Sequence, residues 1–242
     1  SSCSLSASIF ESETAPVPFT SFISLANAVM IAMEDESCGM LPKPVKLGSF
    51  ALLCQSCLDC KTLGHFLRRR IKVLGLISDD IKVMLREEND LVCYEIEANG
   101  DSARLDQHII IIILALAYKM GSWSIRERIP LASVSVCGDR GKRASGYDSL
   151  FDFSINYGQV RNQLCFPAHY LDRQILQDVD SMEQFLRAPA FYLMSEYGVQ
   201  QSLSYEIRKF LQCKSAAEFP GLNIIAANSN LSVATLRRRL QD

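Results

Sequence analysis

Residues Pro220–Asp242 read PGLNIIAANSNLSVATLRRRLQD, and this stretch predicts two short helices joined by a tight turn. Because proline is preformed for a helix start, the first helix is expected to begin near Pro220. Asn230 tolerates the left-handed backbone angles that a tight turn needs. Ser232 is suited to accept a hydrogen bond from the free amides of the second helix. The pattern predicts a helix-turn-helix, whose second helix enters the major groove of DNA.

The side chains of this stretch divide into a buried set and an exposed set. The small Ala226 lets a second helix approach closely, and Leu231 and Leu236 are expected to close a small core. Residues three and four apart are neighbours on a helix, so one exposed face predicts the DNA contacts: Ala234, Arg237 and Arg238. Arg239 is expected to serve the DNA backbone or solvent. A plain turn between two helices is the alternative, and the coincidence of these features favours the DNA-reading interpretation.

The composition predicts one large unit and a smaller one. A chain of 242 residues with 48% hydrophobic content can bury one sizeable core plus a second, smaller one. From Ser204 onward the chain has six basic and three acidic residues, a net charge of +3. Since the whole chain carries −2, the remainder carries −5. An acidic body with a basic end fits a sensor joined to a nucleic-acid reader.

Upstream of the terminal stretch, helical and strand patterns alternate. Helices are predicted over residues 19–33, 47–58, 62–74 (with Thr62 as the cap), 103–120, 181–196 and 199–211. A hairpin over residues 81–97 turns at Glu-Glu-Asn-Asp, and further strands are predicted over 129–137, 151–157 and 163–166. The predicted fold class is α+β. A sensor domain of helices and a small sheet, residues 1–196, is followed by an all-α helix-turn-helix fragment, residues 197–242.

The most apolar stretch and the cysteines bear on location. IIIIILALAY, Ile109–Tyr118, is about half the length of a membrane span, so a buried helix is expected. Nine cysteines form an odd set without a secretory signal, so a disulfide framework is not expected and a reducing cytoplasm is favoured. The chain starts at Ser1 and ends within a predicted helix, which suggests a trimmed piece of a longer protein.

Two upstream segments carry a resemblance together with the terminal one. They are GSFALLCQSCLDCKTLGHFLRR (residues 48–69) and FDFSINYGQVRNQLCFPAHYLDRQIL (residues 151–176). With the helix-turn-helix, they resemble the AraC-type bacterial transcription regulators whose sensor domain is called arabinose-binding-like. The resemblance implies a small effector, of a kind that the family label does not fix, DNA as a partner, and a homodimer. It implies two helix-turn-helix units, of which this chain holds the first, cut short. Independently of the resemblance, no enzymatic activity, cofactor or membrane partner is expected.

The resemblance also implies particular site residues and shows three departures. The DNA-facing positions of the family fall at Ala234, Arg237 and Arg238, the same residues that helical spacing selects. Ser229 stands where a buried leucine is usual, Asn230 where glycine is usual, and Gln174 where the sensor often has proline. The serine loosens the small core of the helix-turn-helix.

An effector pocket is expected between the strands and the helices of the sensor domain. The candidate lining residues are Tyr94, Tyr157 and Phe166, aromatic residues on predicted strands. Because aromatic strand residues commonly fill a plain core, that role is the alternative for each of them.

A cysteine run offers an alternative function. Cys54, Cys57 and Cys60 have the Cys-x-x-Cys-x-x-Cys spacing that occurs in metal sites and suits a redox sensor. A closed metal site needs a fourth ligand, from Cys38 or Cys93. The competing interpretation is three small buried side chains on an apolar helix, and no metal site is assigned.

Other charged motifs give no catalytic centre. Arg68–Arg70 with Lys72 spread around a helix, so a solvated face with one or two ion pairs is expected. GDRGKR, from Gly138, lacks the spacing of a phosphate-binding loop. The histidines are expected to be structural: His65, His108 and His169. No serine lies in a nucleophile-elbow pattern, so a non-enzymatic protein is predicted.

Overall fold

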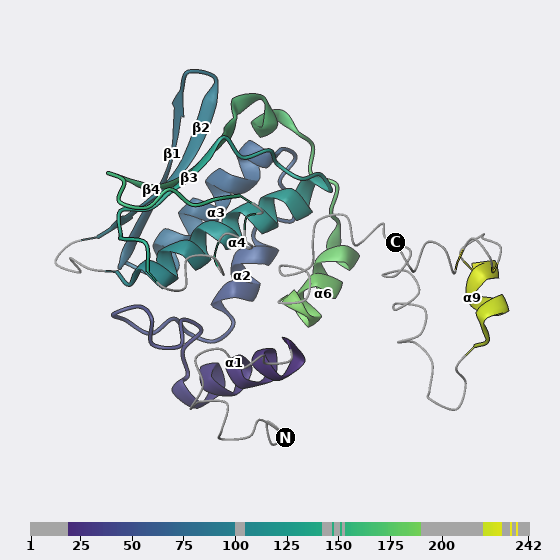
Figure 1. Ribbon diagram of the computed structural model, residues 1–242. Helices are drawn as coiled ribbons and strands as arrows, with labels where there is room; N and C mark the ends of the chain where they lie inside the picture. Colours follow the sequence, from purple (N-terminus) through teal and green to yellow (C-terminus); the bar gives the residue numbers. More distant parts are fainter. Residues whose placement is uncertain are drawn as a thin grey trace. The chain divides into compact units, whose positions relative to one another are not determined.

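The computed structural model describes residues 19–99, 105–141, 147, 151, 153–189, 220–228, 233 and 236 (Figure 1). The chain forms two compact units, Ser1–Met194 and Ser195–Asp242. The first contains helices and a small sheet, and the described part of the second contains one short helix. The predicted α+β class is confirmed.

An antiparallel four-stranded sheet in the order β1-β2-β4-β3 forms the centre of the first unit. β1 and β2 form a hairpin, whose turn residues Asn89 and Asp90 have φ values of 49° and 62°. Two successive left-handed residues are typical of a two-residue hairpin turn. The predicted hairpin is therefore confirmed. The strands are β1 (Ile81–Glu88), β2 (Leu91–Ala98), β3 (Ser133–Ser135) and β4 (Asn162–Pro167).

Two of the three other predicted strands need correction. The strand expected over residues 129–137 shrinks to the three residues of β3, since Pro130 has no N–H to donate to a ladder. The strand expected over 151–157 is wrong: within it, Asn156 makes an isolated bridge to Ser135. The strand expected over 163–166 is confirmed as β4, which lies between β2 and β3.

Helices α3 and α4 cover one face of the sheet (Figure 1). Thr62 caps α3 as predicted, since its hydroxyl accepts a hydrogen bond from the backbone N–H of His65. Asp106 caps α4, which starts and ends later than expected. α2 is shorter than the predicted helix, and α6 begins two residues early and ends at Arg187. The helices are α1 (Phe19–Met33), α2 (Ser49–Gln55), α3 (Leu63–Ile77), α4 (Gln107–Ile125), the 3-10 helix η2 (Ala168–Asp172) and α6 (Val179–Arg187).

The apolar helix α4 is a core element. It is long and apolar enough to cross a membrane by length and composition alone, and 78% of its most apolar window is buried inside the protein. A helix that is buried in this way is a core helix, and core helices of soluble proteins can be equally long and apolar. The prediction of a buried helix over the isoleucine run is confirmed.

The two upstream segments that carry the family resemblance lie against each other. The N–H of Leu63, at the start of α3, donates to the carbonyl of Arg173 at 2.9 Å. Gly64 lies so close to η2 that an added Cβ would be 3.2 Å from the carbonyl oxygen of Leu171. Residues 62–64 (Thr-Leu-Gly) and 171–173 (Leu-Asp-Arg) thus form one junction between α3 and the chain that follows the sheet.

In the second unit, α9 (Leu222–Asn228) supplies half of a small core. Ala226 and Leu236 are buried together, with Ile225 and Val233 packed against them. The prediction that Ala226 is closely packed and that Leu236 closes a small core is confirmed. Leu231 and the predicted helix over 199–211 lie outside the described residues.

Candidate functional site

The sheet packs so closely on α3 and α4 that little space is left between them. A cavity of about 10 Å³ lies there, which is roughly the room that a single water molecule needs. Tyr94 and Phe166, two of the three predicted effector residues, come together in its wall, whereas Tyr157 is half-buried and does not line it. The cavity is lined by Leu67, Tyr94, Ala117, Tyr118, Ile129, Leu164 and Phe166.

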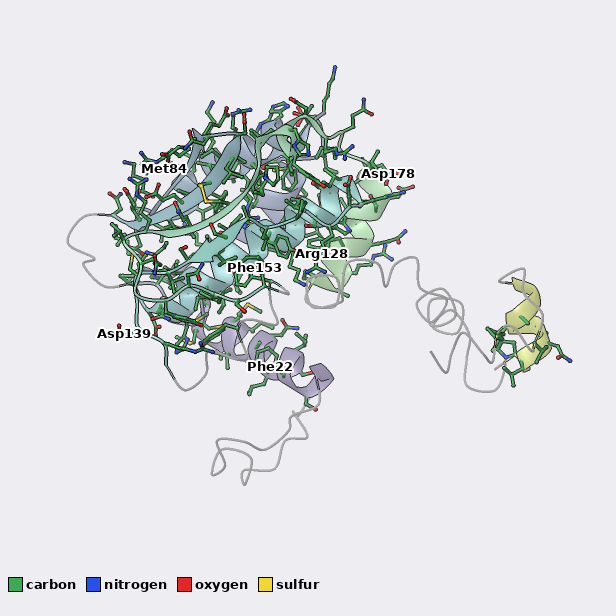
Figure 2. All side chains as sticks on the ribbon, turned by 45° about the horizontal axis from the view of Figure 1, so that its top comes forward. Phe22, Met84, Arg128, Asp139, Phe153 and Asp178 are labelled. Carbon is green, nitrogen blue, oxygen red and sulfur yellow. A yellow bond between two sulfur atoms is a disulfide. The ribbon has the colours of Figure 1, made fainter. Side chains whose placement is uncertain are left out.

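A larger pocket shares Tyr118 with this cavity and is partly open to solvent. Its volume is about 300 Å³, the lower end of the range for small-molecule sites. Tyr118 thus belongs to the walls of both spaces. Its hydroxyl accepts a hydrogen bond from Arg128 Nε at 3.2 Å. The pocket is lined by Tyr118, Arg128, Pro130, Leu131, Phe151 and Phe153; Arg128 and Phe153 are labelled in Figure 2.

Arg70 is a buried cation near Tyr94, one of the residues that line the internal cavity. It is only 2% exposed, since it follows Phe66 by four residues and Leu67 by three on the buried face of α3. Its Nη1 donates to the thioether sulfur of Met120 at 2.8 Å, and its Nε has no hydrogen-bond partner. Within the described part of the chain, no carboxylate forms an ion pair with Arg70. A buried charge without a counter-charge is costly, so this position calls for an explanation.

Tyr94 extends this polar spot from the sheet. Its side chain is fully buried on the face of β2 that α3 and α4 cover, and its hydroxyl makes no hydrogen bond of good geometry. Burial raises the pKa of Tyr94, and the nearby Arg70 guanidinium opposes that rise. A buried guanidinium and a buried hydroxyl therefore lie close together with hydrogen-bonding capacity to spare.

The expectation that Arg70 belongs to a solvated helix face is wrong. Its neighbours behave as expected: Arg68 and Arg69 form surface ion pairs with Glu87 and Asp59. Arg70 instead lies on the apolar side of α3. The signal was present in the helical spacing, which puts position 70 in line with buried residues one turn earlier.

The cysteine run is buried, as the packing interpretation expected. Burial raises the pKa of Cys57, and that of Cys54 and Cys60 to about 12 and about 11. Thiolates are the reactive and metal-binding form, so raised pKa values oppose a redox or metal role. The folded protein holds the Cys54 proton more tightly than the unfolded chain does, because the thiol pKa is about 12 instead of the ordinary 9.0. The stability that results is complete below about pH 9 and is lost as the pH rises toward 12. Among the described residues, no three His, Cys, Asp or Glu side chains are placed to share a metal ion.

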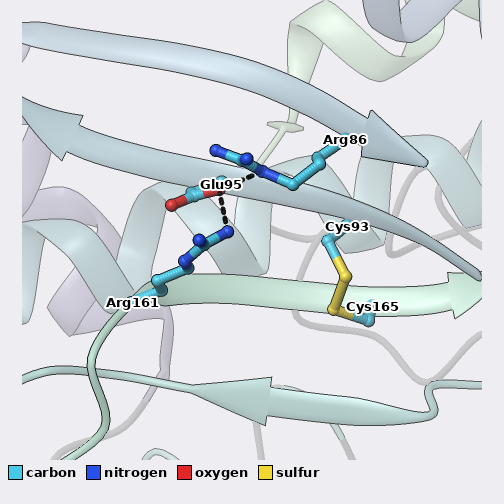
Figure 3. Close-up of a disulfide and its surroundings, with 5 residues drawn as sticks. All are labelled: Arg86, Cys93, Glu95, Arg161 and Cys165. Carbon is cyan, nitrogen blue, oxygen red and sulfur yellow. Dashed lines mark hydrogen bonds and ion pairs between the residues drawn. A yellow bond between two sulfur atoms is a disulfide. The ribbon is translucent and has the colours of Figure 1, made fainter. Parts of the chain in front are cut away.

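The structure contains a disulfide that the sequence analysis did not expect. Cys93 on β2 and Cys165 on β4 are joined on the sheet face away from α3 and α4 (Figure 3). They are 72 residues apart in sequence but directly opposite in the β2–β4 register. The expectation of reduced thiols is wrong for this pair, because only the strand pairing brings the two cysteines together.

Among the described residues, the remaining candidates do not come together in a further centre. The histidines lie on three different elements, α3, α4 and η2: His65, His108 and His169. The phosphate-loop candidate from Gly138 is described only as far as Gly141. The predicted DNA-facing residues lie outside the described residues: Ala234, Arg237 and Arg238.

Comparisons with known proteins identify the family. The family described as "Arabinose-binding domain of AraC transcription regulator, N-term" matches residues 1–175. The crystal structure of the transcriptional regulator CdpR from Pseudomonas aeruginosa is 17% identical over 95% of this chain and 81% of that chain, with a TM-score of 0.39, too low to carry an argument. The comparison with curated proteins finds no match. Since the family match covers most of the 242 residues, the chain belongs to the AraC-type transcription regulators with this N-terminal ligand-binding domain.

Proposed function

We propose that the chain is a DNA-binding transcription regulator controlled by a small effector. Residues 1–196 bind the effector, and residues 197–242 belong to the helix-turn-helix domain that reads DNA. The family match over residues 1–175 carries the proposal, because it assigns a regulator's ligand-binding domain to the first unit. The close packing of Ala226 on Leu236 supports a helix-turn-helix in the second unit, since that motif needs a small residue where its helices meet.

The mechanism is a coupling between two binding equilibria. An effector that binds one arrangement of the dimer more tightly than another shifts the population toward that arrangement, and DNA affinity changes with it. The protein acts as a homodimer in the cytoplasm, without a membrane partner.

Replacement of the predicted recognition arginines tests the DNA-binding part. In the full-length gene product, Arg237→Ala and Arg238→Ala should each weaken binding to a DNA site selected from a random library. A good arginine–base contact is worth about 1–3 kcal/mol, so a loss of roughly 5- to 150-fold in affinity is expected. Electrophoretic mobility shifts at fixed salt measure the loss.

Arg239→Ala is the matched control, because this arginine is expected to face the DNA backbone or solvent. It should weaken binding to all DNA sequences to a similar, smaller extent and reduce the dependence on salt. If Arg237→Ala and Arg238→Ala both cost less than about 1 kcal/mol, the second helix of this motif does not read DNA bases.

A further inference from the structure

We propose that the effector is a small organic acid with an apolar body, and that Arg70 binds its carboxylate with the help of the Tyr94 hydroxyl. This inference rests on the proposed function, since it names the chemical class of the effector. It assigns the site to the junction of α3, α4 and β2, where Arg70, Met120 and Tyr94 meet.

The first argument is charge. Arg70 keeps its positive charge under all ordinary conditions, because a guanidinium is not deprotonated in proteins. At 2% exposure it has lost most of its hydration, and within the described residues no carboxylate pairs with it. One buried monoanion would neutralise this site. A phosphate dianion would replace one unmatched buried charge by another, so a carboxylate fits better.

The second argument is hydrogen bonding. Arg70 Nη1 donates to the thioether sulfur of Met120, which is a weak acceptor, and Arg70 Nε has none. The Tyr94 hydroxyl lies beside Arg70 but makes no hydrogen bond of good geometry. A carboxylate carries two strong acceptor oxygens and binds a guanidinium through two parallel bonds. The three unmet or poorly met groups are therefore a set that a carboxylate would complete.

The third argument is space. The internal cavity of about 10 Å³ cannot hold an organic acid, but the pocket of about 300 Å³ that shares Tyr118 with it can hold the apolar body. Phe151, Phe153 and Leu131 give that pocket an apolar wall. Rotation of the Tyr118 side chain, with loss of its hydrogen bond to Arg128, would join the two spaces. The acid then lies with its body in the outer pocket and its carboxylate toward Arg70.

The polar hollow on the opposite face of the sheet is a weaker candidate. It has a volume of about 360 Å³ and contains Arg86 and Arg161. Both arginines already pair with Glu95, so this hollow lacks the unmatched buried cation that distinguishes the Arg70 site.

Calorimetric titration of the full chain with two acids and their amides tests the proposal. The probes are 4-phenylbutyrate and octanoate, with 4-phenylbutyramide and octanamide as uncharged counterparts. At least one acid should bind more tightly than its amide. Arg70→Met should weaken the binding of that acid about 100-fold or more, as expected for the loss of one partner of a buried charge pair. Tyr94→Phe, which keeps the ring, should weaken it about tenfold.

Arg69→Met is the matched control: it makes the same chemical change one residue earlier, at a surface ion pair, and should leave the affinity within about twofold. The proposal is overturned if neither acid binds at millimolar concentration, if acid and amide bind equally, or if Arg70→Met binds the acid as the parent does. If Arg70→Met does not fold, an unchanged affinity in Tyr94→Phe, or equal binding of acid and amide, overturns it.

The two proposals fail separately. DNA binding that depends on Arg237 without binding of either acid would leave the regulator proposal standing and end this one. Acid binding that depends on Arg70 in a protein whose DNA binding ignores Arg237 and Arg238 would do the reverse.

Discussion

Glu95 and Arg70 are buried charged side chains associated with opposite faces of the sheet, and the two are held very differently. On the face away from the helices, the Glu95 side chain is 3% exposed and accepts from Arg86 Nε at 3.2 Å and from Arg161 Nη1 at 3.5 Å (Figure 3). On the helix-covered side, Arg70 has a thioether for a partner and no carboxylate within the described residues. The outer charge is complete in itself, whereas the inner one lacks an anion. Structure alone explains the first, and the second is best explained by a ligand.

Reduction of the Cys93–Cys165 disulfide should have the largest effect on stability. The bond closes a separation of 72 residues on the outer face, and the entropy of so long a loop corresponds to about 4 kcal/mol. Urea unfolding with and without dithiothreitol measures the loss of unfolding free energy. In the Cys93→Ser/Cys165→Ser variant the reductant should have no effect. A loss below about 1 kcal/mol would mean that strand pairing alone holds the outer face.

Removal of both partners of Glu95 should have the next largest effect. Arg86→Ala with Arg161→Ala leaves a buried carboxylate without a cation and should cost about 3 kcal/mol in unfolding free energy. This is the lower end of the usual range, because both arginines are 44% exposed and water can follow their removal. Urea unfolding at neutral pH measures it.

Lys82→Ala is the control for that variant, since Lys82 forms an exposed pair with Glu97 on the same hairpin and should cost at most about 0.5 kcal/mol. A double variant as stable as Lys82→Ala would show that Glu95 does not need its partners. The contrast between the two faces of the sheet would then disappear.

The outer and inner faces also differ in how far sequence could predict them. The alternation in β1 and β2 and the turn at Asn89 and Asp90 are local signals, and the hairpin was predicted correctly. The Thr62 cap and the isoleucine-rich helix are local in the same sense. The family resemblance likewise rested on short segments, and the family match confirms it.

The features that could not be predicted from the sequence depend on contacts between distant segments. The Cys93–Cys165 bond follows from the β2–β4 register, which no spacing rule contains. Tyr94 and Phe166 both line the small cavity between the sheet and the helices, but the space there is nearly filled by side chains from α3 and α4. Arg70 was missed because three consecutive arginines suggest a solvated surface, although its helical position places it with buried residues.

Replacement of Arg70 should have the smallest effect on stability, and in the opposite direction. Arg70→Met removes a buried charge that has no counter-charge and leaves an apolar side chain of similar length among apolar neighbours. Apolar replacement of buried charged groups is often neutral or stabilising. We expect the free energy of unfolding of Arg70→Met to equal that of the parent or to exceed it by up to about 1 kcal/mol. That of Arg69→Met should be slightly lower than in the parent. A loss above about 2 kcal/mol would make Arg70 a structural cation and remove the contrast with Glu95.

An organic acid should reverse the order of stability of the parent protein and Arg70→Met. A ligand that binds only the folded protein stabilises it by about 2.7 kcal/mol at 100 times its dissociation constant. The parent protein should gain that amount with the tighter-binding of the two acids, and Arg70→Met should gain almost nothing. Without acid the variant is then at least as stable as the parent, and with acid it is less stable. Such a crossing requires that the uncompensated Arg70 charge destabilises the protein without ligand and that a bound anion removes this destabilisation. A purely structural arginine would not produce it.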